Sequence, residues 1–446
     1  MTSVCRSVLG LPIVLAALAV PTSPAVAQRR AIEVPGRPDD SSSGRLAPPT
    51  GCRAVVTDRY VLRAREGGLP WVSISGQARY AEQWLLTGSP AMVWPDGATA
   101  SFVPATDAFI GFVLKRRDTV RMVPNPLPGR RVLFPRVATA PRGWHALLFE
   151  SPSPDNGRGN PSDTVTIWYG EYSGRRWHRV QRVASLTRAR FRDVTASHLV
   201  VDDRGALAFA YPLGRNINLD SPDGHGVVLL HRSGVAWRAD TLATPFPVAY
   251  VSLVPGARRD SWRVMYQMMP PLGHSDGLGW ISLVAFDGAW RARELAVMHR
   301  TRGLTRGSLL AVGRDLFATW TQDRGVTTWG KQVDLRWSPL MPSATMVAET
   351  APIIAPLANE YVVVQFPDQS ILWSVRDSLT AESVRLQYAR GAMAVDAGAV
   401  SAPNHASWTV VPLADRQALL LTARIDETPG AIPVQQVATR LELNCS

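Results

Sequence analysis

Short runs of apolar and aromatic residues recur along the chain, and Gly, Pro, Ser or Asp residues bound them. Runs rich in Val, Trp, Tyr and Phe predict β-strands, and no long segment has a helical period. One arrangement, a strand followed by a small-residue turn and a tryptophan, occurs three times: WYGEYSGRRW at 168–177, VVLLHRSGVAW at 227–237 and WISLVAFDGAW at 280–290. Glycine suits the hairpin position that needs a positive φ. The pattern therefore predicts hairpins, each followed by a tryptophan.

A second apolar strand recurs seven times, with successive starts 45 to 62 residues apart. The segments are AMVWPDG (91–97), WHALLFE (144–150), ALAFAYP (206–212), SWRVMYQ (261–267), DLFATWT (315–321), EYVVVQF (360–366) and HASWTVV (405–411). A period of this length with about four short strands per unit is typical of a β-propeller. We predict an all-β fold, a single seven-bladed β-propeller of four-stranded antiparallel blades, and take these segments as the second strand of each blade.

The unit near 193–243 shows how one blade is predicted. VTASHLVV is its inner strand, Asp203-Arg204-Gly205 a tight turn, and ALAFAY the second strand. After a long loop come VVLLHR, the Ser233-Gly234 turn and WRADTL as the outer strand. A tryptophan that opens the outer strand can cover the hairpin and the adjoining blade. We interpret the recurring tryptophans as packing residues, with stacking on a ligand as the alternative.

The N-terminal segment has the features of an export signal. Val8–Val20 is apolar, Arg6 is the only charge in 1–27, and Ala25-Val26-Ala27 fits a cleavage site. We predict a signal peptide over 1–27, a flexible leader over 28–51 rich in Pro, Ser, Gly and Arg, and a propeller over 52–446. No apolar stretch reaches the length of a membrane span. The expected location is secreted or periplasmic.

Two cysteines remain after the predicted signal, Cys52 and Cys445, one at each end of the folded region. In an oxidising compartment such a pair predicts a disulfide, the alternative being two unrelated buried thiols. If their strands pair in the last blade, the propeller closes by pairing of its N- and C-terminal strands, with the disulfide across the seam.

The charge balance is basic, with 48 Lys plus Arg residues against 36 Asp plus Glu. This excess favours anionic partners. The arginines are scattered and form no recognisable nucleic-acid module, so we expect no nucleic-acid partner. A monomer is expected.

SGRRW, SGVAW and DGAW resemble degenerate forms of the Asp-box turn of secreted sialidase-type propellers, whose pattern is Ser-x-Asp-x-Gly-x-Thr-Trp. The match rests on Gly174, Trp177, Gly234 and Trp237, and less closely on Gly288 and Trp290. In that family these positions are structural, so the resemblance implies a fold. Sialidases also need three arginines, a Tyr–Glu pair and an acidic Asp. LFPRV around Arg136 only loosely echoes their arginine motif, and the other roles find no match.

The predicted loops between the second and third strands (b–c loops) are enlarged in three consecutive units: 151–163, 212–226 and 269–279. Binding residues tend to lie on long loops of rigid scaffolds. The candidates there are Asp155, Asn156, Asn216, Asn218, Asp220, Asp223, His225, His274 and Asp276. The alternative is three solvated turns built from turn-forming residues.

Arginines near the inner strands are a second candidate set, since guanidinium groups bind carboxylates and sulfates bidentately. They are Arg136, Arg190, Arg192 and Arg306; ordinary surface arginines are the alternative. Residues 216, 218 and 220 place oxygens at alternating positions, as in calcium loops, but Ser221 replaces the usual glycine and no Glu closes the loop. We expect no cofactor, with calcium as the alternative.

Three functions remain open. The first is an exported propeller that binds a glycan or another anionic carbohydrate without chemistry. The second is a glycoside hydrolase-like enzyme that uses Asp220, Asp223 or Glu150, a sialidase-like enzyme included. The third is a structural propeller bound to a protein partner of the cell envelope. We expect the first; the catalytic residues of the second cannot be assigned.

Overall fold

Seven β-sheets make up the described part of the fold, and no helix occurs in it. The computed structural model describes residues 49–61, 63–64, 92–93, 99–102, 109–116, 119–130, 132–140, 143–150, 164–173, 175–187, 199–202, 204–213, 225–268, 278–291, 296–302, 307–313, 315–327, 330–340, 345–347, 351–356, 360–366, 368–376, 382–402, 407–424 and 435–446. Most of the predicted signal and leader therefore lies outside the described residues. The compact unit spans Arg45–Ser446.

The first four sheets in chain order form blades 1 to 4, and each runs from an inner strand outwards. Blade 1 is β3 (Met92–Val93), β4 (Thr99–Phe102), β5 (Phe109–Arg116) and β6 (Thr119–Pro124). Blade 2 is β7 (Val132–Ala140), β8 (Gly143–Glu150), β9 (Thr164–Ser173) and β10 (Arg176–Thr187). Blade 3 is β11 (Val200–Val201), β12 (Leu207–Leu213), β13 (His225–Ser233) and β14 (Ala236–Thr244). Blade 4 is β15 (Val248–Pro255), β16 (Ser261–Met268), β17 (Leu278–Asp287) and β18 (Ala296–Arg302).

The last three sheets, blades 5 to 7, follow in the same way. Blade 5 is β19 (Ser308–Val312), β20 (Asp315–Thr327), β21 (Gly330–Pro339) and β23 (Ile353–Ala355). Blade 6 is β24 (Glu360–Gln365), β25 (Ile371–Arg376), β26 (Ser383–Arg390) and β27 (Met393–Ser401). Blade 7 is β28 (Ser407–Ala414), β29 (Gln417–Arg424), β30 (Gln435–Cys445) and β1 (Cys52–Val61).

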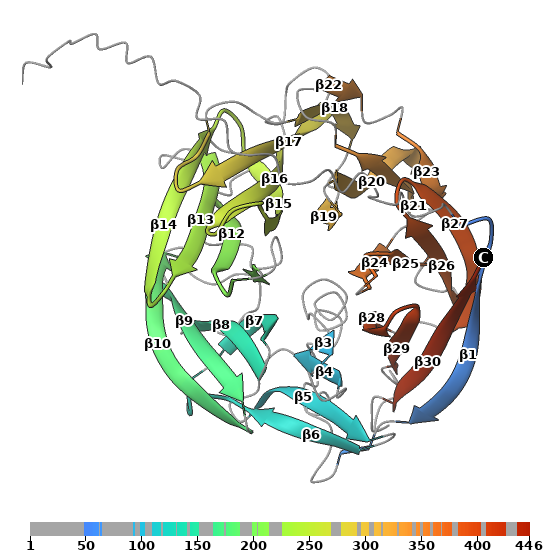
Figure 1. Cartoon of the computed structure of the whole chain (residues 1–446), viewed down its shortest axis with the longest axis horizontal. Coiled ribbons are helices and arrows are strands. Elements are labelled where there is room, and N and C mark those ends of the chain that lie inside the picture. Colours follow the sequence, from blue (N-terminus) through green and yellow to red (C-terminus); the bar gives the residue numbers. More distant parts are fainter. Residues whose placement is uncertain are drawn as a thin grey trace, which may run out of the picture. The chain divides into compact units, whose positions relative to one another are not determined.

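Successive blades lie side by side around a common centre within this unit (Figure 1). Contacts between inner strands lead from β3 to β7, β11, β15 and β19, and β24 and β28 lead back to β3. Blades 5 and 6 share a buried cluster that contains Trp337 and Trp373. The predicted propeller is confirmed, and its blades follow the chain order.

The seam closes as predicted. Strand β1 supplies the outer strand of blade 7 and pairs antiparallel with β30, from Cys52 opposite Cys445 to Val61 opposite Val437. Cys52 and Cys445 form a disulfide. Thr50 also donates its backbone N–H to Ser446, whose own N–H bonds Gly51. The hydrogen-bonded fold therefore begins two residues inside the predicted leader.

The structure corrects two details of the predicted blades. The segments 91–97, 360–366 and 405–411 contribute the inner strands β3, β24 and β28 instead of second strands. Inner and second strands are both covered on their faces, so apolar runs do not distinguish them. In addition, two sheets carry a fifth strand paired in parallel: β2 (Arg63–Ala64) beside β6, and β22 (Thr345–Val347) beside β18.

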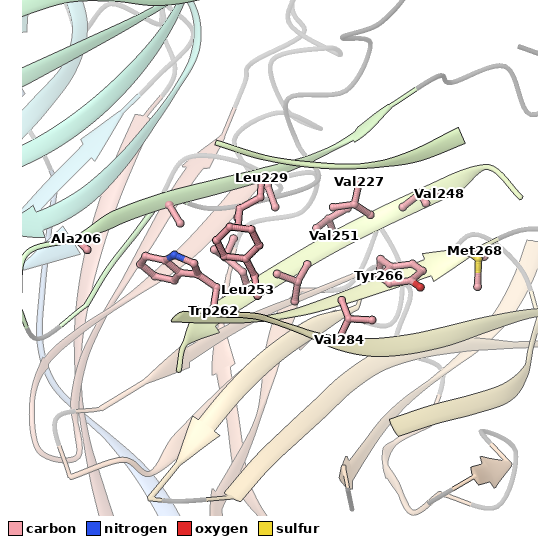
Figure 2. Close-up of a cluster of buried hydrophobic side chains, with 14 residues drawn as sticks. Ala206, Val227, Leu229, Val248, Val251, Leu253, Trp262, Tyr266, Met268 and Val284 are labelled. Atoms are coloured by element: carbon pink, nitrogen blue, oxygen red, sulfur yellow. The ribbon is translucent and has the colours of Figure 1, made fainter. Parts of the chain in front are cut away.

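Apolar side chains fill the spaces between neighbouring blades. Figure 2 shows Val227 and Leu229 of blade 3 facing Val251, Leu253 and Trp262 of blade 4. Trp262 is completely buried. Large rings occupy this interior because each contributes a wide apolar surface.

The recurring tryptophans pack as predicted. Trp177 packs at a tilt against Tyr172 and donates its indole N–H to the backbone oxygen of Pro124 of blade 1 at 2.7 Å. Trp237 packs on Tyr169 of blade 2, and Trp290 lies edge-on to Phe286. The first two connect their own hairpin to the preceding blade, so these tryptophans are structural.

Candidate functional site

The b–c connections define one face of the propeller, because the antiparallel strands of every blade alternate in direction. The structure places these connections at 151–163, 214–224 and 269–277 in blades 2, 3 and 4. Residues at the ends of the second and third predicted loops belong instead to strands β12, β13 and β17. A fourth long connection, 425–434 in blade 7, was not anticipated.

Most of the candidate binding residues lie outside the described residues. They are Asp155, Asn156, Asn216, Asn218, Asp220, Asp223, His274, Asp276, Arg190, Arg192 and Arg306. Their role as a ligand site stays a prediction. The described residues show how the loops are supported.

Glu150 anchors the base of the first loop. Its carboxylate accepts hydrogen bonds from Arg130 at 3.0 Å and from the indole N–H of Trp168 at 2.7 Å. The Arg130 guanidinium also lies over the Trp168 ring, 5.5 Å from its centroid. Because Arg130 belongs to the connection between blades 1 and 2, this contact ties two connections of the same face together. Sequence reasoning missed Arg130 and Trp168, although both bracket the loop.

The role of Glu150 bears on the hydrolase alternative. Both oxygens of its carboxylate are engaged, by the Arg130 guanidinium and the Trp168 indole N–H. The side chain therefore acts as an anchor.

His225 begins β13, directly after the second loop, and is half-buried opposite Thr244. The next residue must be glycine for a steric reason. A Cβ atom on Gly226 would lie 2.4 Å from the backbone oxygen of Leu242. This close approach of β13 and β14 fixes where the loop leaves the blade.

Arg136 lies on β7, the inner strand of blade 2, and has no exposed surface. It pairs with Leu147, whose side chain belongs to the cluster between blades 2 and 3. Arg136 is therefore covered in this structure, and its role as a ligand residue stays a prediction. A large side chain with a long apolar stem can fill the space between blades. Arg376 does the same between blades 6 and 7, where its guanidinium lies 4.7 Å from the ring centroid of Trp408.

A cluster of titratable residues connects blades 2 and 3 near their β9–β10 and β13–β14 turns. The Tyr169 hydroxyl donates to Glu171 at 2.8 Å and lies 2.6 Å from Nδ1 of His145. Since its one proton goes to Glu171, Nδ1 of His145 must donate. Arg232 of blade 3 bonds Glu171 at 3.5 Å and stacks over the Tyr169 ring at 4.5 Å.

The pKa values of three residues in this cluster are shifted. Burial raises the pKa of Tyr169 far above its usual range, and the hydrogen bond to Glu171 acts in the same direction. Burial by itself would raise the pKa of Glu171, but the Tyr169 hydrogen bond and the nearby cations together lower it. Burial lowers the pKa of His145. The Tyr169–Glu171 hydrogen bond and the Arg232–Glu171 contact thus connect blades 2 and 3.

Neither a metal site nor a spanning helix is found in the described part of the chain. No group of three or more His, Cys, Asp or Glu residues there could hold a metal ion. The residues of the calcium alternative lie outside it. No helix among the described residues has the length and apolar character to cross a bilayer.

Comparisons with known proteins give a likeness of fold. No family model and no curated protein matches the sequence. A protein of unknown function from Dyadobacter fermentans is 15% identical, with a TM-score of 0.43 over 70% of this chain and 95% of that chain. A Trypanosoma rangeli sialidase is 11% identical, with a TM-score of 0.42 over 73% of this chain and 56% of that one. For an apocarotenoid oxygenase of Synechocystis the identity is 12% and the TM-score 0.42, over 76% and 77% of the two chains. This chain thus corresponds to little more than half of the sialidase.

Proposed function

We propose that the protein is an exported binding propeller that holds an anionic carbohydrate on the face formed by the b–c connections. The observation that carries the proposal is the run of long connections on three neighbouring blades, 151–163, 214–224 and 269–277. Each leaves a well-packed strand pair, so a rigid scaffold presents all three.

Charge and chemistry support an acidic sugar as the ligand class. The chain carries a formal net charge of +12, which favours anions in general. Asp and Asn residues within the connections suit hydroxyl groups, and arginines suit an acid group. Binding without hydrolysis is favoured because Glu150 is engaged by Arg130 and Trp168. Export is supported by the predicted signal and by the disulfide.

The test is to replace 214–224 by a four-residue turn. Leu213 pairs with Gly226 in the β12–β13 ladder, so a short turn can close the hairpin. Binding to the best acidic glycan on an array should fall at least about tenfold, or 1.4 kcal/mol. The matched control shortens 425–434 of blade 7 in the same way, between Arg424 and Gln435, which also pair.

The outcomes separate the alternatives. Loss of binding in the first variant with retention in the control supports the site. If the shortened 214–224 variant and the 425–434 control both fold well and bind the glycan equally, the ligand site lies elsewhere. Hydrolysis of the bound glycan by the wild-type protein would replace the binding function with a hydrolase.

A further inference from the structure

The face opposite the b–c connections carries a set of exposed arginines. It is formed by the turns between the first and second strands and between the third and fourth strands of each blade. In blades 2 to 4 the described turns and their flanks carry Arg175, Arg176, Arg204, Arg258, Arg259 and Arg291, all exposed. We call this set the basic turn face.

Acidic side chains of the same turns do not neutralise this face. Asp202 is buried and accepts hydrogen bonds from the backbone N–H groups of Arg204 and Ala206. Asp287 is largely covered, with Arg263 at 3.2 Å and Arg291 at 2.8 Å. The third, Asp260, is half-buried. Among the described turn residues of blades 2 to 4, the exposed charge is therefore positive.

Four of these arginines have no side-chain partner. Within the described part of the chain, Arg175, Arg176, Arg258 and Arg259 make no side-chain hydrogen bond or ion pair, and Arg258 bonds Ser261 only through its backbone. Arg232 in the same region differs because it bonds Glu171 and the Gly234 carbonyl. Unpaired guanidinium groups around a rigid set of turns remain available to an external anion.

Apolar side chains on this face distinguish a lipid surface from a soluble polyanion. Among the described large apolar side chains, the most exposed are Val235 at 79% and Met393 at 56%. Val235 lies at the β13–β14 turn, between the arginine-bearing turns of blades 2 and 4, and Met393 opens β27 after the corresponding turn of blade 6. A bilayer gains from burying such tips, whereas a soluble polyanion offers no apolar surface to cover them.

We propose that the basic turn face docks on the headgroup layer of an anionic phospholipid bilayer. Arg175, Arg176, Arg258 and Arg259 contact the lipid phosphates, and Val235 enters the boundary with the acyl chains. Charge complementarity and the exposed apolar tip carry this assignment. It is independent of the proposed carbohydrate site, which would face away from the membrane and stay open to its ligand.

The test measures sedimentation of the purified protein with vesicles of phosphatidylglycerol and phosphatidylcholine, and with vesicles of phosphatidylcholine alone. Binding should require phosphatidylglycerol and weaken as salt is raised. The variant Arg176→Gln, Arg258→Gln, Arg259→Gln should bind anionic vesicles at least about tenfold more weakly, since each arginine near such a surface contributes roughly a fivefold factor. The matched control changes three exposed arginines of blade 7, Arg53, Arg59 and Arg440, to Gln. These substitutions remove the same amount of charge.

A further variant, Val235→Ser, separates a bilayer from other polyanions. It should weaken vesicle binding at least about twofold while leaving binding to heparin unchanged. Three results would overturn the proposal: no preference for phosphatidylglycerol, an equal loss in the blade 7 control, or vesicle binding that is insensitive to Val235→Ser. The third result would indicate a site for soluble polyanions. Loss of glycan binding in the shortened 214–224 variant with intact vesicle binding would show that the two faces act separately.

Discussion

Removing the Cys52–Cys445 disulfide should destabilise the propeller by several kcal/mol. The bond closes a loop of 393 residues, and the chain-entropy model gives about 6 kcal/mol for a loop of that length. This is an upper bound, because β1 also pairs with β30 along its whole length and keeps those contacts when the bond is absent. We expect the double variant Cys52→Ser, Cys445→Ser to lose about 2–5 kcal/mol of unfolding free energy.

The assay is urea unfolding of the wild-type protein, with and without a phosphine reductant, and of the double variant. Reduction should lower the wild-type stability to that of the variant, and the variant should not respond to the reductant. Limited proteolysis of the double variant should also cleave near β1 first, since without the disulfide only the pairing with β30 holds this strand in its sheet. If the double variant unfolds within about 0.5 kcal/mol of the oxidised wild type, strand pairing alone closes the seam and our reasoning fails.

Three further predictions concern stability. Gly226→Ala should cost about 1–3 kcal/mol in urea unfolding because the new Cβ meets the Leu242 oxygen; Gly51→Ala, whose Cβ would touch only a serine side chain at 3.9 Å, should be silent. Trp262→Ala should cost about 3–5 kcal/mol, and a loss below about 1 kcal/mol would contradict its complete burial. The pKa values of Glu171 and Asp287 are lowered in the folded state, so the stability they contribute is present above the unfolded pKa, about 4, and is lost as the pH falls below it. Glu171→Gln should flatten this acid limb of the pH–stability curve, and an unchanged limb would disprove the assignment.

The sequence pattern predicted the features that repeat. Trp177 and Trp237 follow turns at the same position in successive units, so their packing could be inferred from spacing alone. Cys52 and Cys445 were paired correctly because export and their place at the two ends left few alternatives. Both inferences rest on local chemistry combined with the period of the blades.

Contacts between blades could not be predicted in the same way. Arg232 reaches Glu171 across 61 residues of sequence, and neither residue occupies one of the glycine or tryptophan positions that repeat in their segments. Tyr169 and Glu171 are two residues apart and therefore lie on the same face of β9. This spacing is the only signal in the sequence that could have suggested the pair. The complete burial of Arg136, in the middle of β7, could not be read from the sequence either, because only the packing of the blades shows that it is covered.

The pairing of β1 with β30 has a consequence for the order of synthesis and export. Blade 7 lacks its outer strand until β1, made early, meets β30, made nearly 400 residues later. The ring therefore cannot close until β30 has been made; if the predicted signal peptide directs export, the ring stays open until β30 has also crossed the membrane. No incorrect disulfide can form within the chain at that point, because Cys52 and Cys445 are the only cysteines beyond the predicted signal. The propeller can thus close only after nearly the whole chain has been made, and the presence of the disulfide shows that β1 and β30 have paired.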